Sequence, residues 1–218
     1  MAATRKPAPK KRAPAPPIRP KPTVGKATAM DSDPVLFFAT SAAFEAWLEK
    51  NHERSKGVWL QHAKKGASRT SVTYPEALDV SLCWGWIDGQ KRSHDDETFL
   101  QRYSPRGRKS IWSAINREKV RALIDSGRMQ PSGERHVDAA RADGRWENAY
   151  APQRTVQVPA DLQAALDENR EASAFFRTLS GANRYAILHR VLTSQTAKTR
   201  ATRIAKFVAL CARGETVH

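Results

Sequence analysis

The chain has 218 residues, a formal net charge of +15 at pH 7 and 40% hydrophobic residues. This length and apolar content suit one or two small domains that bury a real hydrophobic core. A transmembrane helix is not expected, because no apolar run in the sequence approaches the roughly 20 residues that such a helix needs.

Residues 1–30 differ in composition from the rest of the chain. They hold eight Lys or Arg, no Asp or Glu, and seven of the thirteen prolines. Such a segment cannot bury enough apolar surface to offset the entropy of ordering, so we predict a disordered tail with short polyproline-II stretches. Its cations are candidates for nonspecific contact with nucleic acid or another anionic surface. They include Lys6, Lys10, Lys11, Arg12, Arg19 and Lys21.

The first folded elements are strands and helices in alternation. We predict a strand at 35–39, a helix that starts after Thr40 or Ser41, and a strand at 57–63. Thr73 and Glu76 have the spacing of a capping box, and the helix that follows ends at Gly85. Strands at 86–93 and 98–104 then form a hairpin around an acidic turn.

Helical patterns dominate the remainder of the chain. We predict helices at 110–126 and 133–143, a linker at 151–158, and four short amphipathic helices after Pro159. The predicted fold class is therefore α+β. A small, mainly antiparallel sheet covered by helices occupies 34–150, and a C-terminal helical subdomain occupies 159–216 behind the disordered basic tail.

The hairpin is the first candidate site. Strand alternation places Trp86, Asp88, Gln90 and Arg92 on one face, which is too polar for a plain core. Two indoles beside an acid and arginines predict a ligand pocket. The alternative is a structural Asp88–arginine pair flanked by core tryptophans. The pocket candidates are Trp84, Trp86, Asp88, Gln90, Arg92, Gln101, Arg102, Tyr103, Trp112 and Asn116.

The loop before the helix predicted at 110–126 is the second candidate site. It carries Arg106, Arg108 and Lys109 around a flexible glycine. Cations and free backbone amides at a helix start favour a phosphate or carboxylate. We hypothesise that these residues hold an anionic group that also packs on Trp112. The alternative is a solvated basic loop. No cofactor and no metal site are predicted, because no nucleotide-binding or metal-ligand pattern is present.

Several motifs of the chain resemble one known family. They are Tyr74-Pro-Glu-Ala-Leu-Asp, Trp84-Gly-Trp-Ile-Asp-Gly-Gln, Gln101-Arg-Tyr-Ser-Pro-Arg, Ser110-Ile-Trp-Ser-Ala-Ile-Asn and Ser180-Gly-Ala-Asn-Arg-Tyr-Ala-Ile-Leu. Together they resemble the bacteriocin-protection family, also called YdeI/OmpD-associated, over about 35–216. The resemblance implies an association with protection against bacteriocins and antimicrobial peptides, and with an outer-membrane porin. It implies no catalytic residues.

The predicted function combines this resemblance with the charge of the chain. A +15 protein repels cationic peptides at long range, so a protective role implies an anionic small ligand or protein partner. We expect a stress-associated accessory protein in the cytoplasm, where two distant cysteines stay reduced. Two alternatives remain open. One is a nucleic-acid-binding protein that uses the basic tail, and the other is an uncharacterised enzyme with a pocket around Asp88.

Overall fold

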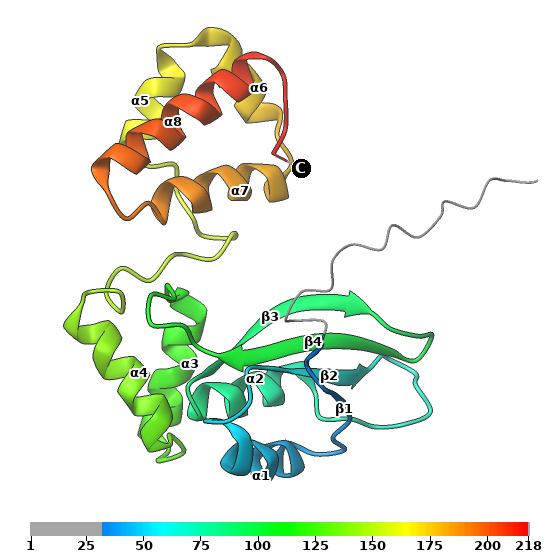
Figure 1. Ribbon diagram of the computed structural model, residues 1–218. Coiled ribbons are helices and arrows are strands. Elements are labelled where there is room, and N and C mark those ends of the chain that lie inside the picture. Colours follow the sequence, from blue (N-terminus) through cyan, green and yellow to red (C-terminus); the bar gives the residue numbers. More distant parts are fainter. Residues whose placement is uncertain (1–31, 218) are drawn as a thin grey trace, which may run out of the picture. The chain divides into compact units, whose positions relative to one another are not determined.

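A computed structural model describes residues 32–217, so the six cationic candidates of the tail lie outside the described residues. Within 32–217 the chain forms a four-stranded, mostly antiparallel sheet and eight helices (Figure 1). The predicted α+β class is confirmed. The division into domains at 34–150 and 159–216 stays a prediction.

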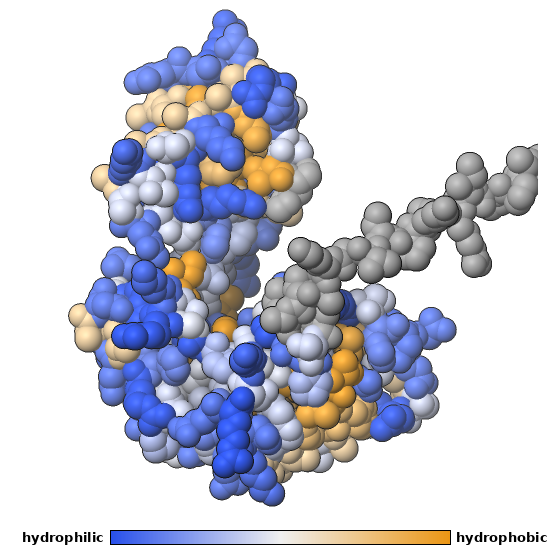
Figure 2. All heavy atoms as spheres, in the orientation of Figure 1, coloured by the Kyte–Doolittle hydropathy of each residue, from blue (hydrophilic) through white to orange (hydrophobic). Residues whose placement is uncertain are grey.

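The sheet has the strand order β1-β2-β4-β3. Its strands are β1 (Val35–Leu36), β2 (Val58–Ala63), β3 (Trp86–Ser93) and β4 (Thr98–Pro105). β1 runs parallel to β2, and the other pairs are antiparallel. The predicted hairpin is β3 and β4, and its turn is held by the Asp95 carboxylate, which accepts hydrogen bonds from the Thr98 amide and hydroxyl. Apolar surface shows over the short edge strand β1 (Figure 2), where Val35 is 46% exposed.

Two helices cover one face of the sheet (Figure 1). They are α1 (Ser41–Asn51), which Thr40 caps, and α2 (Tyr74–Cys83). The capping box predicted at Thr73 and Glu76 is present in full, so the sequence fixes the start of α2 locally. Phe44 and Leu48 of α1 pack with Leu60 and Tyr103 of the sheet to form one hydrophobic core.

A second core forms around α3 (Ala114–Asp125) and α4 (Pro131–Ala142). The helix predicted from residue 110 begins at Ala114, because the Ser113 hydroxyl caps it by accepting from the Asn116 amide. Trp112 therefore precedes the helix, and it is buried against Trp146. α4 packs against the end of α2, where the Ser132 hydroxyl donates to the Trp84 carbonyl.

The C-terminal part consists of four helices with a core of their own. They are α5 (Ala160–Asp167), α6 (Arg170–Thr178), α7 (Gly181–Leu192) and α8 (Ala197–Ala212). Leu166, Phe176, Leu188 and Phe207 meet in this core, as the apolar stripes predict. No helix in the described part of the chain combines the length and the apolar character needed to cross a membrane.

Candidate functional site

Asp88 is part of strand β3, and its carboxylate accepts a hydrogen bond from a phenol instead of pairing with an arginine. The Tyr74 hydroxyl, at the start of α2, donates to Oδ2 of Asp88 over 2.8 Å. Burial, and then this hydrogen bond to a carboxylate, raise the pKa of Tyr74. Tyr74 therefore stays a neutral donor at physiological pH, and Asp88 has a fixed partner.

A second buried pair lies beside the first. Nδ1 of His62 is 2.9 Å from the Val72 carbonyl, which can only accept, so Nδ1 carries the proton. Nε2 then accepts from the Tyr103 hydroxyl over 3.2 Å. Burial lowers the pKa of His62, so the ring is uncharged at neutral pH. His62 is not among the predicted site residues, although its inward position on β2, two residues after Leu60, is a signal that could have found it.

The predicted polar face of β3 is wrong beyond Asp88, because a β-bulge interrupts the alternation. Asp88 lies opposite Tyr103, but the next pair in register is Lys91 with Gln101. One extra residue on β3 therefore moves Lys91 onto the face of Asp88 and Arg92 onto the opposite face. The buried Gln101 side chain fixes the bulge, since its amide nitrogen donates to the Gly89 and Gln90 carbonyls.

The remaining hairpin candidates have separate positions. Arg102 pairs with Asp33, whose Oδ2 lies 2.8 Å from Nε of the guanidinium. The Arg92 guanidinium lies over the Trp59 ring, 4.4 Å from its centroid. Gln90 is exposed, and Asn116 is half-buried on α3. The structure thus brings Asp88, Gln101 and Tyr103 together on one face and leaves the arginines of the set elsewhere.

The predicted tryptophans belong to the two hydrophobic cores. Trp86 is 1% exposed, and its indole nitrogen donates to the His52 carbonyl. Trp84 packs 4.7 Å from the His52 ring, between ring centroids. The indole nitrogens of Trp84 and Trp112 are buried without a hydrogen-bond partner. None of the surface hollows described below is lined by these three tryptophans.

Arg106, a residue of the second candidate site, has an unusually buried side chain. It is only 5% exposed, and its guanidinium carbon lies 3.8 Å from the centroid of the Trp112 ring. Nη1 donates to the Ile111 carbonyl over 3.0 Å, and the backbone amide donates to the Gly85 carbonyl. Among residues 32–217 no carboxylate forms an ion pair with it. Burial lowers the pKa of Arg106 to about 10, so the side chain remains a cation at neutral pH.

The charges near Arg106 have mixed effects, since Tyr150 and Asp88 favour its charged form without forming an ion pair with it. Arg145 acts on it unfavourably, although Arg145 itself pairs with Asp143 over 2.8 Å. Burial lowers the pKa of His136, and the charges of Arg106 and Arg145 lower it further. The other two predicted cations, Arg108 and Lys109, are exposed on the turn that precedes Ser110. The predicted trio therefore separates into one buried cation and two solvated ones.

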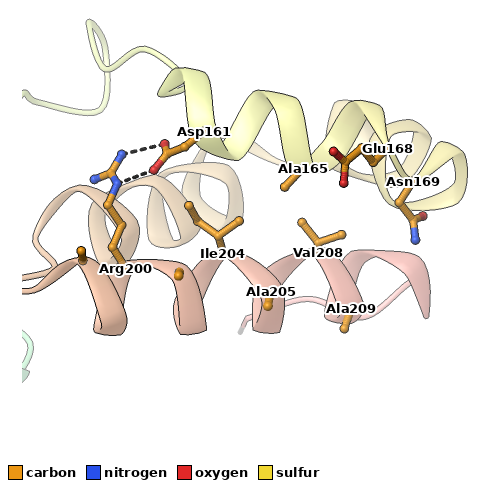
Figure 3. A pocket seen from close by; sticks show the side chains of 11 residues that line it. Asp161, Ala165, Glu168, Asn169, Arg200, Ile204, Ala205, Val208 and Ala209 are labelled. Carbon is orange, nitrogen blue, oxygen red and sulfur yellow. Dashed lines mark hydrogen bonds and ion pairs between the residues drawn. The ribbon is translucent and has the colours of Figure 1, made fainter.

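Two of the hollows on the surface of the described residues bear on the site. One, of about 430 Å³, lies between the loop 64–73 and the hairpin, and His62, Tyr74 and Phe99 line it. The other, of about 690 Å³, is a groove between α5 and α8 (Figure 3). Arg200 and Asp161 form a two-point ion pair at one end of this groove, with 2.5 Å between Nε and Oδ2.

The comparisons with known proteins divide the chain in two. Residues 155–214 match a family model described as "Bacteriocin-protection, YdeI or OmpD-Associated". This segment belongs to that family. Residues 36–136 match a different model, described as a domain of unknown function, DUF8412. The bacteriocin-protection match therefore covers the C-terminal part of the range 35–216 over which the motifs suggested it. No curated protein and no solved structure gave a significant match.

Proposed function

We propose that this protein is a cytoplasmic accessory protein of the bacteriocin-protection type that acts by binding an anionic small ligand or partner at Arg106. The C-terminal family match supports the class of protein. The position of Arg106 supports the mode of action, and it is the single observation on which the proposal rests.

A buried cation without an anionic partner is costly. Removing a charged group from water costs several kcal/mol unless an opposite charge and hydrogen bonds compensate for it. Arg106 has a ring face, one backbone carbonyl and a favourable but unpaired charge at Asp88, which Arg145 opposes, and it has no ion pair among the described residues. An anion that bound at the guanidinium would supply the missing charge, so the site is better satisfied when occupied.

The geometry of Arg106 suits such a ligand. Trp112 covers one face of the guanidinium, and Nη1 is engaged by Ile111, which fixes the plane of the group. Nε and Nη2 have no acceptor among the described residues, and they are not among the fully buried unpaired atoms, so they keep some solvent contact. Two adjacent N–H groups on a fixed plane match the paired oxygens of a carboxylate or phosphate.

The surrounding charge favours capture of anions. Arg108 and Lys109 lie close in sequence and are exposed, so they raise the local potential for an approaching anion. The same charge repels cationic antimicrobial peptides, and the resemblance to the family implies protection against such peptides. Protection would then follow from what the bound anion or anionic partner does, and direct sequestration of cationic peptides is disfavoured.

Calorimetric titration of the full chain with inorganic phosphate tests this proposal. Arg106→Gln removes the charge, and we expect it to weaken phosphate binding at least tenfold. Arg106→Lys keeps the charge but loses the planar fork, so its effect should be intermediate. The control is Arg121→Gln, an exposed cation on α3 that pairs with Glu118. Circular dichroism of each variant establishes that it is folded.

Two results would overturn the proposal. The first is unchanged phosphate binding by a folded Arg106→Gln variant. The second is loss of binding on deletion of residues 1–30 with no effect of Arg106→Gln, which would favour the nucleic-acid alternative. In cells, the proposal also predicts that Arg106→Gln fails to restore peptide resistance to a deletion strain, whereas Arg121→Gln restores it.

A further inference from the structure

The hollow of about 430 Å³ beside the hairpin has the features of a second ligand site, which does not depend on Arg106. It lies where the loop between β2 and α2 approaches the tip of the hairpin (Figure 1), joined by a hydrogen bond from the Lys64 amide to the Glu97 carbonyl. Eleven residues line it, and none of them carries a carboxylate. Its volume is in the range of pockets that hold small molecules.

Three aromatic rings form one wall of this hollow. The rings of His62 and Phe99 stack with centroids 5.2 Å apart, and Tyr74 lies edge-on to His62. Both nitrogens of His62 are engaged, by Val72 and Tyr103, and the Tyr74 hydroxyl is engaged by Asp88. The polar atoms of the wall are therefore already satisfied, and ring surface is what the wall offers to a ligand. That surface suits an aromatic body.

Lys91 adds a positive charge beside Phe99, although it is not itself one of the lining residues, whose own cations are Lys64 and Arg69. Its ammonium lies over the Phe99 ring, 4.1 Å from the centroid, and its charge contributes to the lowered pKa of His62. Among residues 32–217 it has no ion-pair partner. The β-bulge is the reason for its position, because regular pairing from Asp88 onward would have placed Lys91 on the opposite face. Gln101, which fixes the bulge, thus positions the cation beside the aromatic wall.

We infer that this hollow binds a small aromatic carboxylate. The ring of the ligand would lie against Phe99 and Tyr74, and its carboxylate would pair with the Lys91 ammonium at the solvent side. The aromatic contacts supply affinity through apolar area, and the ion pair supplies preference for an anion. No acidic residue of the lining opposes that charge.

Three probes that share one ring system and differ in charge test the inference. They are 2-naphthoate, the neutral 2-naphthalenemethanol and the cationic 2-naphthylmethylamine, titrated into the full chain by calorimetry. We expect naphthoate to bind about three- to tenfold more tightly than the alcohol, and the amine to bind least. Lys91→Gln should remove the preference for naphthoate over the alcohol. Lys50→Gln, an exposed cation near the end of α1, is the matched control and should keep it.

Further variants locate the site. Phe99→Leu should weaken all three probes at least fivefold, since it removes the ring but keeps an apolar side chain. Gln101→Leu should release the bulge and reduce the preference for naphthoate, with less effect on the alcohol. In a chain that carries Arg106→Gln, naphthoate should still bind at the hollow and its preference should still depend on Lys91, which separates this site from the proposed anion site. Equal affinities for naphthoate and the alcohol, or a preference that survives Lys91→Gln, would overturn the inference. So would a folded Phe99→Leu variant with unchanged affinities.

Discussion

The Tyr74 hydroxyl donates to Oδ2 of Asp88 across 2.8 Å and joins the first turn of α2 to strand β3. The acid that the sequence presents as a catalytic or ligand-binding candidate is therefore part of a structural hydrogen bond. Because Tyr74 is also the first helical residue after the N-cap Thr73, its side chain is directed by the same local signal that starts the helix.

Removing this hydroxyl should destabilise the fold. Tyr74→Phe leaves a partly buried carboxylate without its donor, so we expect a loss of about 1 to 3 kcal/mol in the free energy of unfolding. Asp88→Asn keeps an acceptor of the same shape and should cost less. Urea denaturation followed by circular dichroism measures both. No effect of Tyr74→Phe would show that the bond does not contribute to stability.

Stability should fall in mildly acidic solution because His62 is buried and uncharged. Its folded pKa lies below its unfolded value, which is about 6.5. Below that pH, His62 binds a proton in the unfolded chain but stays unprotonated in the folded chain. The stability contribution of His62 is therefore complete above pH 6.5 and is lost as the pH falls toward its folded pKa.

Denaturation curves between pH 7.5 and 5 measure this effect. A group of this kind gives a slope of at most about 1.4 kcal/mol per pH unit. His136 and His189 also have lowered pKa values, so His62→Gln should reduce the slope without abolishing it. An unchanged slope in the His62→Gln variant would contradict the account of its protonation.

More of the fold than of the candidate site could be predicted from the sequence. The capping box at Thr73, the hairpin and the helical stripes after Pro159 are local patterns, and each predicts its element. The bulge is not a local pattern, because it depends on where the Gln101 side chain meets the β3 backbone. The alternation rule therefore placed Lys91 and Arg92 on the wrong faces.

The burial of Arg106, like the bulge, depends on contacts that are not local in sequence. Its sequence neighbours Arg108 and Lys109 are solvated, and nothing in the loop's composition distinguishes the three. Arg106 differs because its amide continues the β3–β4 pairing to Gly85 and because Trp112 turns back over it before α3 begins. Both conditions are tertiary, so composition predicted a basic loop and not a single buried cation.

Gly133 should be intolerant of a methyl group. Replacing glycine by alanine inside a helix ordinarily stabilises it by about 1 kcal/mol. Here the added Cβ would clash with the Cys83 carbonyl oxygen, which also accepts from the Gln130 amide and has little room to move. We expect overpacking to dominate, so that Gly133→Ala lowers the midpoint of thermal unfolding. Arg135→Ala, at an exposed position of the same helix, is the control. A rise in the midpoint for Gly133→Ala would contradict the close packing of α4 on α2.

Arg106 should reduce stability when no anion is bound. Arg106→Met removes a buried charge and keeps apolar contact with Trp112, so we expect the free energy of unfolding to rise by about 1 kcal/mol or more in phosphate-free buffer. Phosphate at 100 times its dissociation constant should stabilise the wild type by about 2.7 kcal/mol and the variant by much less. A variant that is less stable than the wild type without phosphate would indicate that Arg106 is a structural residue.

The most direct test of the central claim is crystallographic. Crystals of the chain soaked in tungstate, a heavy analogue of phosphate, give an anomalous signal that locates the bound anion without reference to the protein. We predict a peak within hydrogen-bond distance of the Arg106 guanidinium, on the side away from the Ile111 carbonyl, and its absence in crystals of Arg106→Gln. Tungstate bound only at exposed side chains such as Arg108 and Lys109, with none at Arg106, would contradict the claim.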